Sequence, residues 1–309
     1  MSRPGAPRIG LVLHPRRDTM AVAERIARWA FSHGSEVLVD ETDAARCPPE
    51  GVRAVTSDEL AGEADALASI GGDGTMLGAL RLVSRRPVPV LGVNLGRLGF
   101  LIEVEPEELD GALDRIEAGE FTIEEHDAIV LSDGAEERIA FNDVALARVP
   151  GDGPVQAAVT MEGRPGGRYR CDALVVATPI GSTAYSYAAG GPVVSPSLDA
   201  LIVSVVAPIS GISRPVVISG DESFELAILD GSGEPALEID GVVVRRARPG
   251  DTLGIGLRQA AGLVVRLDPD SHRRRNQLKL SLLGLPFLPE EMQDLAPRKT
   301  RGPGRANDA

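Results

Sequence analysis

The first 118 residues alternate between short apolar runs and segments with helical periodicity. The runs with the length and composition of buried strands are 9–13, 36–39, 66–70 and 88–93. The segments with apolar residues at helical spacing are 20–31, 76–83 and 105–118. Gly34 stands where the C-terminal glycine of the first helix belongs, just before the second strand. Strands that alternate with helices in this way predict an α/β domain with an open, mostly parallel sheet.

After Gly119 the pattern changes to short runs rich in β-branched residues, separated by glycine, proline and aspartate. These runs are 128–131, 156–161, 174–177, 201–206, 224–229, 242–244 and 263–267. Such a series predicts a mainly β domain, sandwich-like in architecture. The sequence Asp-Gly-Ser-Gly at 230–233 lies between two apolar runs and predicts a hairpin.

The chain therefore divides into four expected parts. Residues 1–119 form the α/β domain, and residues 120–270 form the β domain. We expect residues 271–296 to pack back on the first domain. The polar tail at 297–309 lacks periodicity, and we expect it to be disordered.

The strongest local motif is a glycine-rich loop between an expected strand and an expected helix. Its residues are Gly71, Gly72, Asp73, Gly74 and Thr75. Glycines allow backbone N–H groups to approach a phosphate, and the start of a helix adds positive potential there. An aspartate would repel that phosphate, so its presence indicates a chemical role, such as accepting a hydroxyl proton or helping to hold a cation. The alternative is a helix N-cap in a tight turn; the position of the whole motif after a strand favours function.

Two further segments carry ligand-binding features. Residues 94–101 follow the next expected strand, and the carboxyl ends of parallel strands share one crevice. Residues 178–192 combine small residues, hydroxyls and two tyrosines, a composition suited to a planar ring and a ribose. The alternatives are ordinary turns for the first segment and a short capped helix for the second.

The basic residues exclude several nucleotide-using mechanisms, because only Lys279 and Lys299 are lysines. A P-loop needs its Gly-Lys-Ser/Thr, a protein kinase needs a strand lysine near its glycine-rich loop, and a Schiff-base enzyme needs a lysine amine. The net charge of −13 argues against nucleic-acid and membrane partners. Two isolated cysteines, Cys47 and Cys171, and the lack of an export signal favour a cytoplasmic location.

Residues 71–75, 94–101, 142–143 and 178–192 together resemble, in order and spacing, the successive signatures of the NAD kinase family. The resemblance covers most of the chain. A glycine-glycine-aspartate-glycine loop is also found in lipid kinases and phosphofructokinases, whereas only the NAD kinase pattern has the later glycine-serine-threonine-alanine-tyrosine segment.

The resemblance implies an α/β domain, a β domain and a substrate cleft between them. It implies a homo-oligomer, commonly a dimer or tetramer. It also implies Mg²⁺-dependent transfer of a phosphoryl group from ATP, or polyphosphate in some members, to the 2′-hydroxyl of the adenosine ribose of NAD, giving NADP.

The resemblance also assigns roles to residues. Asp73 would be the catalytic proton acceptor, and Gly74 would contact the dinucleotide. Asn142 and Asp143 would hold the adenosine, while Arg170 and Asp172 would line the nicotinamide side, commonly from a neighbouring subunit. The other residues expected to bind phosphate or dinucleotide are Gly71, Gly72, Thr75, Asn94, Gly96, Phe100, Thr183, Ala184, Tyr185, Ser186 and Ala188. No side chain is expected to form a resident metal site.

Five positions depart from the family pattern. Asp143 replaces glutamate and Ala173 replaces glycine, while Ile180 and Ala188 replace hydroxyl residues and Val242 replaces glutamine. Lost polar groups remove contacts that a ligand would otherwise satisfy. The alternatives are therefore a diverged kinase acting on another hydroxylated or adenosine-containing metabolite, or a non-catalytic dinucleotide-binding regulator.

Overall fold

The computed structural model describes residues 7–46, 49–96, 101–134 and 136–268. Phe100, the segment 271–296 and the tail 297–309, for which the sequence makes predictions, lie outside these residues. The part up to Leu267 forms one compact unit. None of the helices in the described ranges is long and apolar enough to cross a membrane.

The helices of the described residues are α1 (Met20–Ser32), α2 (Glu41–Ala44), α3 (Ser57–Glu63), α4 (Asp73–Leu82), α5 (Leu109–Glu117) and α6 (Tyr185–Ala188), with 3₁₀ turns at Pro106–Glu108 and Ile180–Thr183. Helices α1, α4 and α5 lie close to the predicted segments, whereas α2 was not predicted. Gly34 has a φ of 72° after α1, which confirms its predicted place at the end of that helix. Helix α3 was not predicted. It begins with a capping box in which Thr56 and Glu59 each bond the other's backbone N–H.

The strands fall into a parallel group and a larger antiparallel group. The parallel group is β1 (Arg8–Leu13), β2 (Glu36–Asp40), β3 (Arg53–Val55), β4 (Ala66–Gly71) and β5 (Pro89–Asn94). The others are β6 (Thr122–Ser132), β7 (Glu137–Ala140), β8 (Asp143–Ala147), β9 (Val155–Met161), β10 (Arg164–Cys171), β11 (Ala173–Ala177), β12 (Ala200–Val206), β13 (Ser210–Gly211), β14 (Val216–Ser219), β15 (Phe224–Ile228), β16 (Ala236–Ile239), β17 (Val242–Arg246) and β18 (Thr252–Arg266).

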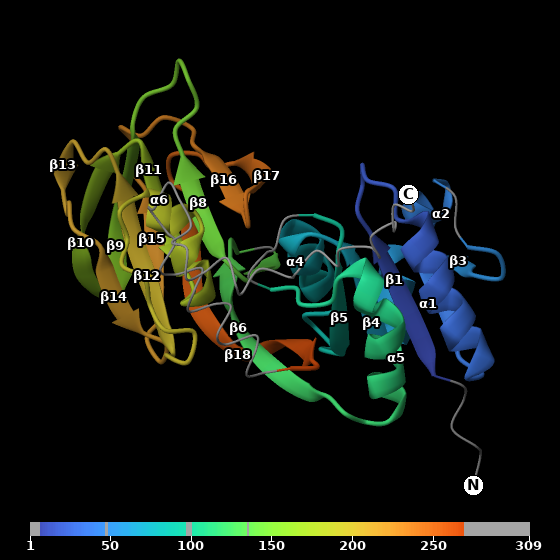
Figure 1. Ribbon diagram of the computed structural model, residues 1–309. Coiled ribbons are helices and arrows are strands. Elements are labelled where there is room, and N and C mark those ends of the chain that lie inside the picture. Colours follow the sequence, from blue (N-terminus) through green and yellow to red (C-terminus); the bar gives the residue numbers. More distant parts are fainter. Residues whose placement is uncertain (1–6, 47–48, 97–100, 135, 269–309) are drawn as a thin grey trace, which may run out of the picture. The chain divides into compact units, whose positions relative to one another are not determined.

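The amino-terminal strands form a parallel sheet, as predicted, and their order is β3-β2-β1-β4-β5 (Figure 1). Strand β3 was not predicted. Side chains alternate between the two faces of the sheet. Apolar residues of α1 and α5 pack with Leu11, Val37 and Ile70 in one core, whereas α3 and α4 pack with Leu38 and Leu67 in another. The strand order reverses at β1, because β2 lies on one side of it and β4 on the other.

The carboxy-terminal half is a sandwich, which confirms the predicted β architecture. One sheet has the order β14-β12-β11-β8-β16-β17. It packs on β9, β10, β15 and part of β18, and the two layers share a core that includes Leu146, Val176, Leu226 and Ile255. The predicted hairpin at 230–233 is wrong: β15 pairs with β9 and β18, whereas β16 pairs with β8 and β17 in the other sheet. The segment is a crossover between layers.

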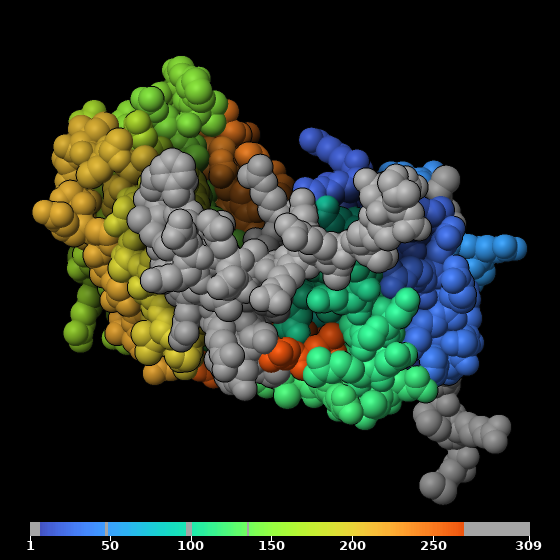
Figure 2. Space-filling view, in the orientation of Figure 1, coloured from blue at the N-terminus to red at the C-terminus, as the bar shows by residue number. Residues whose placement is uncertain are grey.

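Strand β18 joins the two halves. Its first residues pair with β15, and Leu263 and Val264 pair in parallel with β5, so the parallel sheet continues into the sandwich. After the end of β18, Arg115 of α5 donates a 2.6 Å hydrogen bond to the carbonyl of Leu267. In the space-filling view, this red end of the strand lies beside the green surface of α5 (Figure 2). The sequence predicted only the last residues of this long strand.

Candidate active site

The glycine-rich loop lies where β4 ends and α4 begins, as predicted. Gly71 is the last residue of β4, and its carbonyl accepts a 2.8 Å hydrogen bond from Leu95 after β5. A Cβ on Gly71 would come within 2.2 Å of Thr75 Oγ1, so the turn requires glycine there. Gly72 then caps α4 with extended backbone, and its carbonyl accepts the N–H groups of Thr75 and Met76.

Gly72 and Gly74 are glycines that neither the backbone nor the packing requires. Gly72 has a φ of −120°, and Gly74 lies in the first turn of α4. Among the described residues, no atom lies within 4 Å of a Cβ built on either one. Glycine in a helix costs about 0.5–1 kcal/mol relative to alanine. The first N–H groups of a helix also lack partners within it. The described residues therefore leave space and N–H donors for a phosphate at the start of α4.

Asp73 is the first residue of α4, and its side chain is half-buried. Its Oδ1 accepts a 3.1 Å hydrogen bond from the backbone N–H of Leu101. Leu101 returns the chain from the segment that follows β5. The carboxylate is thus held at the loop by the backbone, in an orientation that a flexible surface aspartate would not keep.

Asn94 and Gly96 shape the turn after β5. The buried amide of Asn94 donates to Glu105 at 2.9 Å and to the carbonyl of Gly96 at 3.3 Å, and it accepts from Gly96 N at 3.0 Å. Arg17 donates to the carbonyl of Leu95 and lies against Gly96, where a Cβ would displace it. The structure therefore places Asn94 beside the loop, but its amide is occupied by the chain itself.

Asn142 and Asp143 lie at the start of β8, and the carboxylate of Asp240 holds their backbone. Asp240 accepts hydrogen bonds from the N–H groups of Phe141, Asn142 and Asp143 at 2.7–3.2 Å. Arg81, near the end of α4, donates to the same carboxylate, whose side chain is 0 % exposed. This ion pair connects α4 directly to the segment that carries Asn142.

Hydrogen bonds also connect the segment 178–188 to the backbone at Asn142. Thr178 N donates to the carbonyl of Asn142 at 2.9 Å, and Thr178 Oγ1 donates to that of Phe141 at 2.6 Å. Thr178 Oγ1 in turn accepts from Gly181 N at 3.0 Å. A Cβ on Gly181 would lie 1.9 Å from the carbonyl oxygen of Asn142, so this close approach requires glycine. Two predicted motifs that are distant in sequence thus meet.

Asp143 is a carboxylic acid in an unusual environment. It is only 3 % exposed. Burial and, to a lesser extent, the nearby carboxylate of Asp240 raise its pKa to about 7, although a hydrogen bond from the backbone N–H of Tyr185 acts to lower it. Burial likewise raises the pKa of Tyr185. Near neutral pH, Asp143 can therefore either donate or accept a hydrogen bond.

Four other predicted residues belong to this segment, and the hydroxyls of two of them bond to the chain itself. Ser186 is buried, and its hydroxyl bonds that of Ser204 at 2.9 Å. Thr183 Oγ1 donates to the carbonyl of Ile180 at 3.2 Å. Ala184 joins the 3₁₀ turn to α6, and Ala188 is exposed at the end of α6. The hydroxyl of Ser186 therefore helps to fold the segment.

Arg170 and Asp172 do not join the other predicted residues within one chain. Arg170 lies on β10, and Asp172 precedes β11, where it forms an ion pair with Arg148 at 3.3 Å. Asp172 lies before the first residue of β11, whereas Thr178 lies after its last residue. The length of the strand, roughly 17 Å at about 3.4 Å per residue, therefore separates the two.

A shared core holds the two groups of motif residues together. Met76 and Leu80 of α4 pack in one cluster with Phe141, and Ile180 packs against it. Gly262 of β18 lies under the ring of Phe141, where a Cβ would come within 2.7 Å of Cε1. The first turn of α4 and the Asn142 segment therefore rest on the same apolar contacts.

Arg81 and Asp240 were not among the residues predicted for the site. The Asp-Gly pair at 240–241 is a turn signal, and both residues have positive φ, 47° and 77°. Nothing in the sequence indicates that the aspartate of this turn binds the backbone about a hundred residues earlier. Only the pairing of β16 with β8 brings them together.

A parallel sheet with a glycine-rich loop at a strand end, beside the point where strand order reverses, defines a class of proteins that bind phosphate-bearing nucleotides. The ATP-NAD kinase N-terminal domain model matches residues 9–121, and the ATP-NAD kinase C-terminal domain model matches residues 141–261. The chain belongs to the NAD kinase family.

The chain is also similar to individual NAD kinases and to solved structures of this fold. NAD kinase 1 of Streptomyces avermitilis is 34 % identical, with 90 % of this chain and 88 % of that protein covered. NAD kinase of Heliobacterium modesticaldum is 36 % identical, with 84 % and 94 % covered. An Archaeoglobus fulgidus NAD kinase in complex with ATP has a TM-score of 0.68 at 27 % identity, covering 89 % and 98 %. Yeast NADH kinase complexed with NADH has a TM-score of 0.77 at 21 % identity, covering 93 % and 90 %, and shares the fold.

Proposed function

We propose that this protein is an NAD kinase, which transfers the terminal phosphoryl group of ATP to the 2′-hydroxyl of the adenosine ribose of NAD. The observation that carries the proposal is Asp73 in its loop. It is a carboxylate held by the backbone at the start of α4, between two glycines around which the described residues leave open space. The identity of 34–36 % to NAD kinases over most of the chain supports it.

Each motif has a role in this proposal. Asp73 accepts the proton of the attacking hydroxyl, while the N–H groups near Gly72 and Gly74 bind phosphate oxygens. Asn142 and Asp143 hold the adenosine, and residues 183–187 surround the adenine. Phosphoryl transfer depends on positioning and charge neutralisation more than on covalent chemistry, so these groups suffice on the protein side.

Mg²⁺ belongs to this proposal as an ion carried by the nucleotide. Within the described ranges, no three histidine, cysteine or carboxylate side chains are grouped to hold a metal ion. Mg²⁺ in phosphoryl-transfer sites is typically bound by one or two carboxylates together with substrate phosphates. The ion would neutralise charge on the phosphates, while Asp73 keeps the role of proton acceptor.

The positions at which this chain differs from the family pattern affect which phosphoryl acceptor the protein prefers. Ile180 packs against the shared core, so it offers no hydroxyl to a ligand. Ala173 is buried within β11, and Val242 is 54 % exposed on β17. Asp143 has a shorter side chain than glutamate and is almost fully buried. We propose that these changes adjust affinity for the dinucleotide while leaving Asp73 and its loop in place.

We further propose that residues 1–119 supply the phosphate side of the site and residues 120–270 the adenosine side. Self-association to a dimer or tetramer would bring Arg170 and Asp172 of a second copy to the nicotinamide. Both are exposed or half-buried on the described chain, and they lie far from its own Asn142. Asp172 pairs with Arg148, and the side chains of these two residues remain accessible at the surface.

The direct test is to incubate the purified full chain with Mg-ATP and NAD and to measure NADP with an NADP-specific dehydrogenase. We expect Asp73→Asn to keep NAD binding and to lose turnover by roughly 10²- to 10⁴-fold, the usual contribution of a general base. The exposed Asp230→Asn serves as the matched control. Full activity in Asp73→Asn would refute the assigned role.

Parallel reactions with polyphosphate or NADH identify the donor and the acceptor. NAD binding without NADP formation by the wild-type chain would favour a regulator. ATP consumption with another hydroxylated acceptor would favour a diverged kinase. Loss of activity on adding a chelator is expected if Mg²⁺ accompanies the nucleotide.

A further inference from the structure

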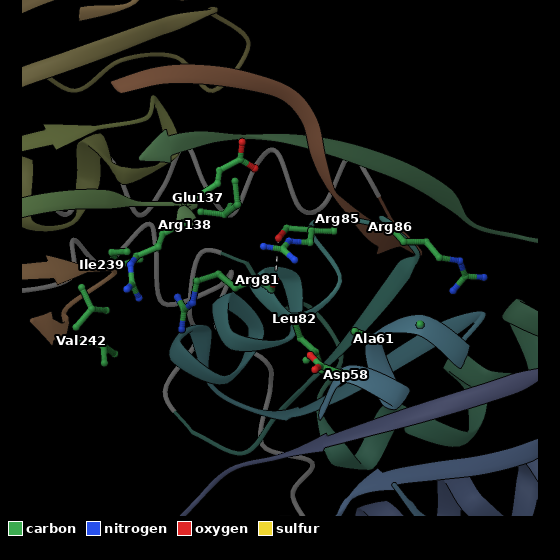
Figure 3. Close-up of a pocket in the computed structure, with 14 residues that line it drawn as sticks. Asp58, Ala61, Arg81, Leu82, Arg85, Arg86, Glu137, Arg138, Ile239 and Val242 are labelled. Carbon is green, nitrogen blue, oxygen red and sulfur yellow. Dashed lines mark hydrogen bonds between the residues drawn. The ribbon is translucent and has the colours of Figure 1, made fainter. Parts of the chain in front are cut away.

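A hollow of about 600 Å³ lies between the carboxyl-terminal end of α4 and the edge of the sandwich (Figure 3). Volumes of 300–1,000 Å³ are typical of small-molecule sites. Its walls come from α3 and α4, the turn after α4, and strands β7, β16 and β17. The lining residues are Asp58, Ala61, Gly62, Arg81, Leu82, Ser84, Arg85, Arg86, Glu137, Arg138, Ile139, Ile239, Val242 and Val244.

This hollow is separate from the proposed catalytic site. Asp73 is the first residue of α4, whereas Arg81 lies near its last turn, so about 12 Å of helix separates them at 1.5 Å per residue. The catalytic loop residues do not line the hollow.

The lining of the hollow contains more arginines than carboxylates, in a protein whose net charge is −13. Four guanidinium groups line it against two carboxylates. One of those carboxylates, Glu137, is already paired with Arg258. Arg81, Arg86 and Arg138 pair with Asp240, Asp65 and Glu136, so the positive charge without a carboxylate partner among the described residues is that of Arg85. An uncompensated guanidinium in a concave site attracts anions even when the whole protein is acidic.

Two of the four arginines have donors to offer. Arg81 is held by Asp240, and Arg86 bonds the carbonyl of Ala64 and pairs with Asp65; its guanidinium points away from the other three in Figure 3. Arg85 forms no hydrogen bond or ion pair with any described residue.

Arg138 is only partly engaged. Its Nη2 pairs with Glu136, but its buried Nε has no acceptor among the described residues. Burying a guanidinium N–H without a partner costs free energy that a bound anion would recover.

An apolar wall faces these donors. Ile239, Val242 and Val244 form one side of the hollow, and Val242 remains 54 % exposed. In Figure 3, Arg138 extends beside Ile239, on the same side as Val242. A ligand with a charged end and a less polar body would match such a site.

We propose that this hollow is a second anion-binding site, which takes a phosphorylated metabolite with its phosphates on Arg85 and Arg138. The guanidinium group binds phosphate oxygens through paired N–H donors, which makes arginine well suited to this ligand. The concave shape and limited volume favour a small molecule over a macromolecular surface. The proposal does not depend on the reaction at Asp73.

The test is calorimetric titration of the full chain with sodium tripolyphosphate, and separately with ATP. Wild type is compared with Arg85→Gln, with Arg85→Gln/Arg138→Gln, and with the control Arg28→Gln, which changes an exposed arginine on α1 outside the hollow. We expect saturable binding to the wild type and the control, a weaker affinity in the single variant, and at least a tenfold loss in the double variant.

The difference between wild type and the double variant isolates the hollow, because both chains keep the loop around Asp73. Arg85→Gln removes an exposed side chain without a partner, so it tests the site without endangering the fold. A more than tenfold preference for ATP would identify a nucleotide lying on the apolar wall, and equal affinities would identify a phosphate chain. Equal binding by all four chains, or no binding of either probe, would overturn the proposal.

Discussion

Asp143 shows how one residue can acquire a property that its sequence position does not reveal. Any aspartate after an asparagine could be a surface carboxylate with an ordinary pKa. Here the side chain is 3 % exposed and lies near the carboxylate of Asp240. Both conditions disfavour the ionised form, burial more strongly than the neighbouring charge. The pKa of about 7 therefore follows from the tertiary environment.

This pKa predicts a pH dependence of stability. The unfolded carboxyl ionises near 3.8 and the folded one at about 7. Between these values the folded chain holds a proton that the unfolded chain has lost, so its stability falls as pH rises. At about 1.4 kcal/mol per pH unit, the loss amounts to a few kcal/mol. Asp143→Asn should remove this slope, as measured by urea unfolding from pH 4 to 8.

His126 also contributes to the pH dependence of stability, so the effect of Asp143 is measured as the difference between the variant and wild-type curves. Burial lowers the pKa of His126 to about 4, so between pH 4 and 6.5 it gives a slope of opposite sign in every chain that retains it. Subtracting the wild-type curve from the Asp143→Asn curve cancels that contribution. The exposed Asp230→Asn should give a flat difference. A flat difference for Asp143→Asn as well would contradict the raised pKa.

At the scale of elements, the turn between β16 and β17 organises the adenosine side of the proposed site. Asp240 and Gly241 both have positive φ, as a two-residue type I′ turn requires. The turn directs a fully buried carboxylate toward the backbone at the start of β8 and toward Arg81. One side chain thereby links a hairpin, a strand and a helix.

Asp240→Asn tests this linkage. Asparagine tolerates positive φ, so the turn should persist, but the amide loses the charge-assisted bonds to the N–H groups and to Arg81. Hydrogen bonds to a charged group contribute about 1.5–3 kcal/mol each. We expect the KM for NAD to rise at least tenfold, with a smaller change in kcat, because the adenosine contacts lose their support while Asp73 is untouched.

The measurement is steady-state kinetics with NAD as the varied substrate, and Asp230→Asn is the matched control. An unchanged KM would show that the backbone at Asn142 keeps its position without Asp240. An equal loss in kcat and kcat/KM would instead assign Asp240 a role in the chemical step.

At the scale of the molecule, the described halves share both a sheet and a core. Strand β18 runs from the sandwich to a parallel pairing with β5. Phe141 belongs to the sandwich half but packs with Met76 and Leu80 of α4. A chain built in this way should lose both halves together when it unfolds.

Phe141→Ala tests that expectation. The ring is 1 % exposed, and loss of a buried phenylalanine typically costs 3–5 kcal/mol. Trp29, the single tryptophan, lies on α1 in the other half, so its fluorescence reports on that half. We expect fluorescence and circular dichroism to show one coincident transition in the wild type, shifted together in the variant.

The matched control is Phe31→Ala, because that ring is 40 % exposed and contributes less buried surface. A shift seen by circular dichroism but not by Trp29 fluorescence would mean that the halves unfold independently.

The sequence determined the local features of this protein. Periodicity predicted α1, α4, α5 and the parallel strands β1, β2, β4 and β5, because each pattern depends only on neighbouring residues. The glycine-rich loop could be placed after β4 for the same reason, and the order of the motifs identified the family. Asp-Gly at 230–231 and at 240–241 gave the same turn signal, yet only the second closes a hairpin. Strand partners, which local sequence does not encode, made that difference.

The tertiary structure alone decided which distant groups meet. Asp240 reaches the backbone of Asn142, Arg81 connects that pair to α4, and Asp143 becomes buried, all because β16 pairs with β8 and the two halves share a core. The sequence predicted Asp73, Asn142 and Thr183 as candidates from their motifs. Their burial, hydrogen-bond partners and charge depend on contacts between residues far apart in the chain, which is why those properties required the folded structure.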